Sequence, residues 1–351
     1  MARLYLDRTF LKVLRNASQI LTMRYYATEC VTLNPYTEGM KNIGLTEKLN
    51  SFKSVRELLK VFSTEKKCEN FLKKVRWGNE IVSPYDNTAK VYKCSRNRFR
   101  CSKTGKDFNV KTGTMFEDTK IELRTWFLAI FIITTHKKGI SSMQLAKDLN
   151  VTQTTAWFIL HRIRNCFKIE NNIVLDNDVE IDETYVGGKN KNRHKNKKVK
   201  NSQGRSMKDK VAVLGMVERN GKLIARTVED VQADTLTKEI LKSVKKSANI
   251  YTDEWLGYKD IHKFYNHEIV NHGAREFVNG NAYTNNMECF WGILKRGIIG
   301  IYHFTSKKHL QKYLDEFVFR FNTRYNSAEE TFEHLLTNMT VRTRYKYLIA
   351  A

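Results

Sequence analysis

The chain of 351 residues has little of what would place it in a membrane or outside the cell. Its longest apolar run, residues 126–134, is far shorter than the ~20 residues of a membrane-spanning helix. The first 25 residues mix Arg, Asp and Lys into every apolar stretch, so no signal peptide is expected. The six cysteines lack the spacing of a disulfide framework, which favours a reducing compartment. We therefore expect a soluble, cytoplasmic protein.

Acidic residues are scarce relative to basic ones. Lys and Arg number 61 against 37 Asp and Glu, which gives a formal net charge of +24. Hydrophobic residues make up 41% of the chain, enough for a sizeable core, so a wholly disordered chain is excluded. This charge excess favours a polyanionic partner, most often nucleic acid, with an anionic membrane surface as the weaker alternative.

Proline is also scarce, with only two residues, so periodicity must locate the elements. Residues 1–77 form an N-terminal helical region whose role the sequence does not indicate, with helical spacing clear over 54–75. Residues 78–120 are typical of short strands and turns. Residues 121–170 are helical and contain two helices joined by a short turn at 150–152.

This helix, turn and helix pattern is typical of a helix-turn-helix that reads DNA, although an ordinary helical hairpin has the same pattern. Ser141 or Ser142 is the expected N-cap of the first helix. The second helix opens with polar side chains and ends in a basic segment, residues 161–164. The predicted DNA contacts here are Thr152, Gln153, Thr154, Thr155 and Arg162.

Beyond residue 175 the hydrophobic period changes to 2, which indicates strands. Strands and helices then alternate in an α/β order that predicts a mixed sheet flanked by helices. The expected strands are 179–185, 211–217, 222–231, 250–252 and 268–271, and the expected helices are 235–247, 285–296 and 308–321.

Between the first two strands lies a basic insertion, residues 189–210, in which ten of 22 residues are Lys or Arg and one is acidic. Such a segment cannot bury a core, so it is either a solvated linker or an arm that neutralises DNA phosphates. We favour the arm. Its predicted phosphate contacts are Lys195, Lys197, Lys198 and Lys200.

Three carboxylates stand at positions where acids need an explanation. Asp182 lies within a strand expected to be central, Asp253 follows another strand, and Glu288 begins a helix. For Glu288 a helix-capping role is the alternative. Glu288, Trp291 and Lys295 fall at i, i+3 and i+7, on one helix face. Three carboxylates from two strands and a helix can hold two Mg²⁺ ions, which suits phosphodiester chemistry.

Several stretches between about residues 78 and 325 resemble DDE transposases of bacterial insertion sequences, in the ISXO-like group related to Merlin elements. The similarity is carried by residues 180–188 (EIDETYVGG), 251–254 (YTDE), 270–272 (VNH), 284–291 (TNNMECFW), 294–303 (LKRGIIGIYH), 308–317 (KHLQKYLDEF) and 319–322 (FRFN).

This resemblance implies an RNase H-like catalytic core over residues 175–330, followed by a C-terminal tail, 331–351. It places Asp182, Asp253 and Glu288 in the catalytic, metal-binding positions, with Asn285 as the alternative third ligand. The expected cofactor is Mg²⁺, two ions per site, with Mn²⁺ as a possible substitute. Further DNA contacts are expected at Lys295, Arg296 and His272.

The implied function is transposition of an insertion sequence. The protein would bind terminal inverted repeats, cleave DNA in a metal-dependent step and join the ends to target DNA. It would act on DNA as a dimer or higher oligomer, associated with the bacterial nucleoid. The alternatives are a catalytically silent DNA-binding regulator and an RNase H-like nuclease without strand transfer.

One segment departs from the family. Relatives often carry a zinc ribbon with paired cysteines ahead of the helix-turn-helix, but here the corresponding stretches are 83–86 and 101–104, with a single cysteine. Cys94 and Cys101 alone cannot close a zinc site, so we expect no structural zinc. Residues 78–120 are therefore predicted to be a degenerate zinc-ribbon-like segment held by packing of Tyr92, Phe99 and Phe108.

Overall fold

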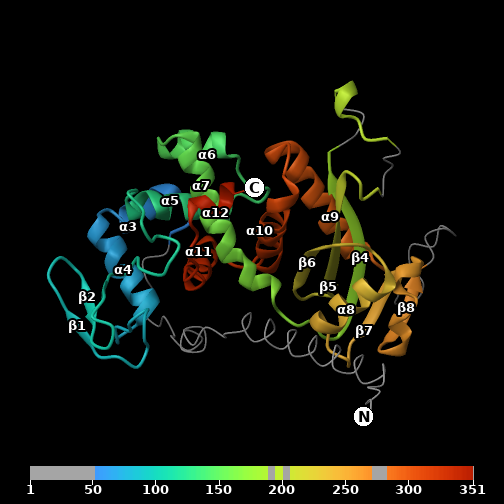
Figure 1. Ribbon diagram of the computed structural model, residues 1–351, viewed down its shortest axis with the longest axis horizontal. Helices are drawn as coiled ribbons and strands as arrows, with labels where there is room; N and C mark the ends of the chain where they lie inside the picture. Colours follow the sequence, from blue (N-terminus) through green and yellow to red (C-terminus); the bar gives the residue numbers. More distant parts are fainter. Residues whose placement is uncertain (1–51, 189–193, 201–205, 271–282, 351) are drawn as a thin grey trace, which may run out of the picture. The chain divides into compact units, whose positions relative to one another are not determined.

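The computed structural model describes residues 52–188, 194–200, 206–270 and 283–350, which belong to one compact unit, Asn50–Ala351 (Figure 1). His272 and most of the predicted N-terminal region lie outside the described residues. No helix in the described part of the chain is long and apolar enough to cross a bilayer.

A five-stranded mixed sheet lies in the C-terminal half of the chain, where the period-2 pattern predicts strands. Its strands lie in the order β6-β5-β4-β7-β8 (Figure 1). The first three are antiparallel neighbours, whereas β4, β7 and β8 run parallel. The strands are β4 (Asp178–Gly187), β5 (Lys210–Glu218), β6 (Leu223–Val228), β7 (Asn249–Asp253) and β8 (Asn266–Val270).

Helices pack on both faces of this sheet, which confirms the predicted α/β architecture. Helix α8 (Ala233–Ser243) buries Leu236 and Ile240 with the β4 side chains of Val179 and Ile181. Helices α9 (Asn285–Gly297) and α10 (Leu310–Asn322) pack on the opposite face. Alternate residues of β4 therefore point toward α8 and toward α9, so Asp182 lies on the α9 face.

The remaining helices form a second region around a cluster of phenylalanine rings. It contains α3 (Val55–Val61), α4 (Glu65–Trp77), α5 (Leu123–Thr135), α6 (Ser142–Leu149), α7 (Gln153–Phe167) and α11 (Ala328–Thr337). Phe332 of α11 lies 5.3 Å from the ring of Phe52 and 5.5 Å from that of Phe127. The segment 331–351, expected as a tail, is thus in part a packed component of this region.

Residues 78–120 contain a small antiparallel sheet of β1 (Val91–Lys93), β2 (Phe99–Cys101) and β3 (Asp107–Phe108). Phe99 and Phe108 are buried and pack edge-on against Trp77 of α4. Tyr92 is 57% exposed, so the expectation that it packs in this core is wrong. A salt bridge of 3.0 Å between Lys103 and Asp86 joins the two loops where relatives carry cysteine pairs.

Candidate active site

The pairing of β4 with β7 brings two of the three predicted acids together. Glu180 is opposite Tyr251 in a parallel register, so two residues further along each strand Asp182 and Asp253 become neighbours on the α9 face. Their electrostatic repulsion contributes to the pKa of Asp182. The sheet therefore forms an acidic pair at the end of β7.

Asp182 lies in a partly buried, strongly acidic setting. Burial, followed by the nearby charges of Glu183 and Asp253, raises the pKa of its carboxyl from 3.8 to about 7. Its Oδ1 accepts a hydrogen bond from the Glu183 backbone N–H at 2.8 Å, and Oδ2 accepts one from Trp291 Nε1 at 2.9 Å. Oxygen donors that repel one another fit a hard divalent cation, which would relieve this repulsion.

Trp291 can reach Asp182 because β5 carries a glycine directly opposite. Gly215 is the register partner of Asp182, and a Cβ there would lie 2.6 Å from the Trp291 ring and 2.2 Å from Met287 Cε. A glycine inside a strand often marks such a close approach. The side chain of Trp291 is thus both a buried part of the core and a wall of the site.

The start of α9 is tied to β4 by hydrogen bonds to a buried carboxylate whose role the sequence did not reveal. Glu180 is fully buried and accepts hydrogen bonds from Arg219 Nε at 3.0 Å, the Asn286 backbone N–H at 3.0 Å and Asn286 Nδ2 at 2.7 Å. The Arg219 guanidinium also lies 3.7 Å from the centre of the Tyr283 ring. A carboxylate at a helix N-terminus is favourable, so this contact fixes the position of α9 on the sheet.

The third predicted acid is more exposed than the other two. Glu288 and the alternative ligand Asn285 are both exposed on α9. Among the described residues there is no group of three or more His, Cys, Asp and Glu side chains that could hold a metal. Glu288, Trp291 and Lys295 were predicted to share one helix face. Their burial differs in the structure, because Trp291 is buried against the sheet whereas Glu288 and Lys295 are exposed.

The two helices predicted on either side of residues 150–152 are present, with a left-handed Asn150 ending α6 and Thr152 capping α7. The side-chain oxygen of Thr152 accepts from the Thr155 backbone N–H, and Gln153 Nε2 donates to Ser142 Oγ at 2.8 Å. Gln153 and Thr154 are exposed at the start of α7.

The basic end of α7 does not face solvent, which corrects one prediction. Arg162 is only 6% exposed and donates to the Met115 carbonyl at 2.8 Å, so its assignment as a DNA contact is wrong. Arg164 is buried against Glu316. His161 is also buried, and burial together with nearby positive charge lowers its pKa to about 2. This segment therefore serves packing.

The other predicted DNA contacts remain at the surface where the structure describes them. Lys195, Lys198 and Lys200 are exposed in the basic insertion, and Figure 1 shows this segment beyond the ends of β4 and β5. Lys295 and Arg296 are exposed on α9. The side chain of Lys197 lies outside the described residues.

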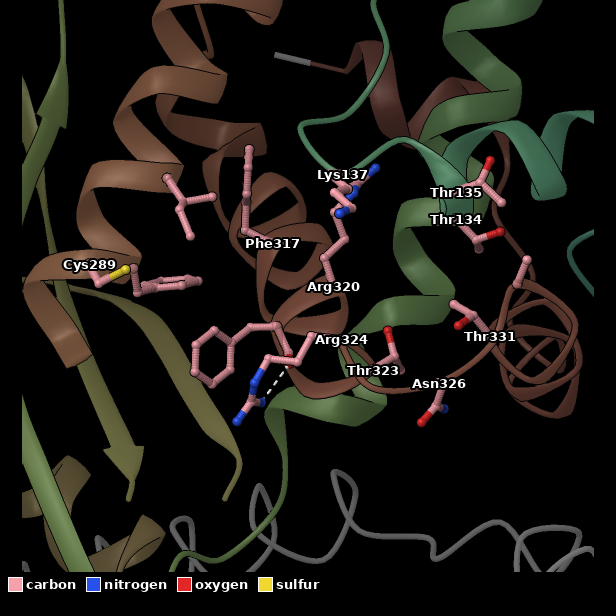
Figure 2. Close-up of a pocket in the computed structure, with 14 residues that line it drawn as sticks. Thr134, Thr135, Lys137, Cys289, Phe317, Arg320, Thr323, Arg324, Asn326 and Thr331 are labelled. Atoms are coloured by element: carbon pink, nitrogen blue, oxygen red, sulfur yellow. Dashed lines mark hydrogen bonds between the residues drawn. The ribbon is translucent and has the colours of Figure 1, made fainter. Parts of the chain in front are cut away.

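A separate pocket of about 620 Å³ lies between the end of α5, helices α9 and α10, and the start of α11 (Figure 2). Phe290, Ile293 and Phe317 provide apolar walls, and Lys137 and Arg324 add positive charge. The lining includes neither of the paired aspartates, so this pocket is distinct from the acidic site.

Part of the chain is similar to known proteins. Residues 174–322 match the family described as the ISXO2-like transposase domain. A protein of Halobacterium salinarum, described as an uncharacterized protein in transposable element ISH50, is 26% identical over 275 residues. This match covers 75% of the present chain and 92% of the relative.

Solved structures of Mos1 complexes also match, at low similarity. The Mos1 strand transfer complex matches with 12% identity and a TM-score of 0.26, covering 80% of this chain and 95% of that chain. The Mos1 transposase paired-end complex with left transposon end matches with 13% identity and a TM-score of 0.24, covering 81% and 96%.

Proposed function

We propose that this chain, an insertion-sequence transposase of the ISXO2-like group, cuts DNA at the ends of its element and joins the freed 3′ ends to target DNA. The observation that carries this proposal is the parallel register that sets Asp182 beside Asp253, where burial and repulsion hold the pKa of Asp182 at about 7. Such a carboxylate pair is suited to metal-assisted phosphoryl transfer.

Asp182, Asp253 and Glu288 are the residues that would hold Mg²⁺, with Mn²⁺ as a substitute and two ions per site. When bound, these ions supply an activated oxygen nucleophile and neutralise charge that develops on the phosphate. The aspartate pair fits such ions because both residues offer oxygen ligands in a partly buried setting. Glu288, one helical turn before Trp291, is the proposed third ligand, and Asn285 is its alternative.

The chain itself orients the Asp182 carboxylate. The Trp291 indole N–H holds Oδ2 of Asp182, and the Glu183 N–H holds Oδ1. The bonds from Glu180 to Asn286 set the start of α9 and therefore the place of Trp291 and Glu288. A fixed ligand set of this kind lowers the reorganisation needed when substrate binds.

Further observations support an RNase H-like core and DNA as the substrate. Three antiparallel strands are followed by two parallel ones in the same sheet, with helices on both faces. The exposed start of α7 is suited to reading terminal inverted repeats in the major groove. The basic insertion would hold phosphates, and two DNA ends would be brought together by a dimer or higher oligomer on the DNA.

The test is an assay of the full chain with Mg²⁺ or Mn²⁺ on labelled duplexes that carry the terminal inverted repeats of its own element. We expect nicked ends and joined products with the wild type, and loss of both with Asp182→Ala, Asp253→Ala and Glu288→Ala. The matched control is Glu229→Ala, because Glu229 is an exposed acid in the loop before α8 and should leave both products unchanged.

The other outcomes separate the alternatives. Activity retained by Glu288→Ala and lost by Asn285→Ala would move the third ligand to Asn285. Nicking without joined products would indicate a nuclease, and tight binding of the ends without any metal-dependent product would indicate a regulator.

A further inference from the structure

The loop between α9 and α10 presents two apolar side chains to solvent. Ile299 is 61% exposed and Phe304 is 70% exposed. Single exposed apolar residues are common on protein surfaces and need no explanation. Here, however, both belong to one short segment, residues 298–306. The backbone of this segment is held by packing, and positively charged residues flank it on both sides.

This loop is anchored at several points, so the exposure of its tip does not come from a lack of packing. Ile298 is buried, and Gly297 packs so closely on Phe317 that a Cβ would lie 2.3 Å from the ring. Tyr302 donates a hydrogen bond of 2.6 Å from its hydroxyl to Glu316 and packs edge-on against Tyr313. Because the backbone is already fixed, a ligand would bind with little loss of conformational entropy.

The backbone also adopts a conformation that proteins rarely retain without a reason. Residues Ile298–Tyr302 form a π-helical turn, and His303 follows with φ 58° and ψ −43°. A non-glycine residue at positive φ costs on the order of 1–3 kcal/mol, and such residues concentrate at functional sites. The His303 conformation directs the chain so that Phe304 leaves the surface rather than joining the core.

Positive charge lies on both sides of the exposed tip. Lys295 and Arg296 precede it, and Lys307 and Lys308 follow it, all exposed. Just beyond them, burial and then the charges of Lys308 and Arg164 lower the pKa of Lys312. The cations at the start of α10 therefore repel one another, and they would be stabilised by an anionic partner.

We propose that residues 298–306 form a wedge that enters DNA next to the reacting phosphate, with Phe304 stacking on a base and the flanking cations holding neighbouring phosphates. This inference rests on the proposed transposase function and adds a separate DNA contact to it. The loop begins about two helical turns beyond Trp291, roughly 10 Å along the helix axis. An aromatic ring in this position stabilises a base that has left the duplex stack.

The test combines substitutions in the protein with a change in the DNA. Binding of the full chain is measured by fluorescence anisotropy on two duplexes with the same terminal repeat, one fully paired and one with mismatched pairs at the cleavage end. A wedge binds more tightly where the base pairs are already open, because the energy of opening the duplex no longer has to be supplied. We expect the wild type to bind the mismatched duplex at least tenfold more tightly.

Phe304→Ala should weaken binding to the mismatched duplex by roughly 5- to 150-fold, the range expected for loss of one stacked base. It should also remove the preference for the mismatched duplex, whereas Phe304→Trp should keep that preference. The matched control is Tyr325→Ala, since Tyr325 is 84% exposed and lies just beyond the other end of α10. A paired Lys307→Ala and Lys308→Ala variant should reduce the dependence of log K on log salt by ~0.9 per lost phosphate contact.

The wedge is overturned if Phe304→Ala keeps the wild-type preference, or if it loses affinity equally on both duplexes. The two proposals fail in different ways. Metal-dependent products with a preference that is insensitive to Phe304 would remove the wedge and leave the transposase. A Phe304-dependent preference without any such products would retain the wedge and remove the proposed chemistry.

Discussion

Substitution of Glu316 tests how the helical region is attached to the five-stranded sheet. This carboxylate is fully buried in α10 and accepts three short contacts, each 2.6 Å, from Arg164 of α7, Arg320 of α10 and the Tyr302 hydroxyl. Removing one partner of a buried pair costs about 3–5 kcal/mol, because the other charge stays buried without compensation. Glu316→Gln should therefore be strongly destabilising although it preserves the size of the side chain.

The pKa of Glu316 gives a second estimate of this loss of stability. Burial by itself would raise this pKa, but Arg320 and Arg164 lower it from 4.5 to about 2. The interval between these values, at ~1.4 kcal/mol per pH unit, corresponds to ~3 kcal/mol. The folded-state pKa is depressed, so this stability is fully present above pH 4.5 and is lost as the pH falls toward 2.

The assay is urea and thermal unfolding of the full chain followed by circular dichroism, for the wild type, Glu316→Gln and the exposed control Glu229→Gln. A loss of ~3 kcal/mol lowers Tm by roughly 4 °C in a chain of 351 residues, because the entropy of unfolding is about 2.1 cal/mol/K per residue. The control should stay within about 0.5 kcal/mol of the wild type. The wild-type and Glu316→Gln stabilities should converge between pH 4.5 and 2, where Glu316 becomes protonated. Equal stability at pH 7, or a gap that widens on acidification, would refute this reasoning.

Two further predictions address the site and the DNA contacts. Gly215→Ala should displace Trp291, because the new Cβ overlaps the indole. It should destabilise the fold by about 1–3 kcal/mol and reduce metal-dependent cleavage. The control is Gly188→Ala, whose Cβ would have no neighbour within 4 Å. Unaltered cleavage by Gly215→Ala would show that the Trp291 contact is dispensable. Arg162→Ala should lower stability and leave the salt dependence of DNA binding unchanged, whereas Lys198→Ala should leave stability unchanged and reduce that salt dependence. Unfolding curves measure the first quantity and binding titrations the second. A reduced salt dependence with unchanged stability in Arg162→Ala would show that Arg162 contacts DNA.

Secondary structure was predictable wherever local chemistry decides it. The N-cap of α6 was expected at Ser141 or Ser142, and Ser141 is the residue whose side chain bonds within the first turn. Thr152 caps α7 in the same way. The hairpin between β5 and β6 follows from Asn220-Gly221, where Asn220 adopts φ 59°. Alternation along β4 likewise indicated which residues share a face. In each case the information lies within a few residues of the element concerned.

Long-range contacts were not predictable from the same patterns. The basic run around Arg162 has the composition of a DNA contact, but α10, α5 and the segment before α5 cover it in the fold. Glu180 gave no signal of its own, because its role depends on Arg219 and Asn286, distant in sequence. The packing of Phe332 on Phe52 likewise joins residues that only the folded chain brings together.

The acidic pair of Asp182 and Asp253 was predictable only in part. Each aspartate could be placed at a strand from its local pattern, but their adjacency depends on the parallel pairing of β4 with β7. The resemblance to DDE transposases supplied that adjacency as an expectation. Glu288 was a candidate from its local pattern and from the resemblance, and its exposed position on α9 leaves its role to the assay proposed above.

Helix α9 connects these features physically. Its first turn is held by Glu180, its centre donates from Trp291 to Asp182, and its last turn carries Lys295 and Arg296. The helix continues directly into the anchored loop that presents Phe304. Because one helix carries both the contact with Asp182 and the proposed DNA contacts at its end, a shift of α9 against the sheet would move them together. Weakening the Glu180 anchor should therefore disturb cleavage and the handling of the DNA end in the same variant, whereas loss of Phe304 should disturb only the second.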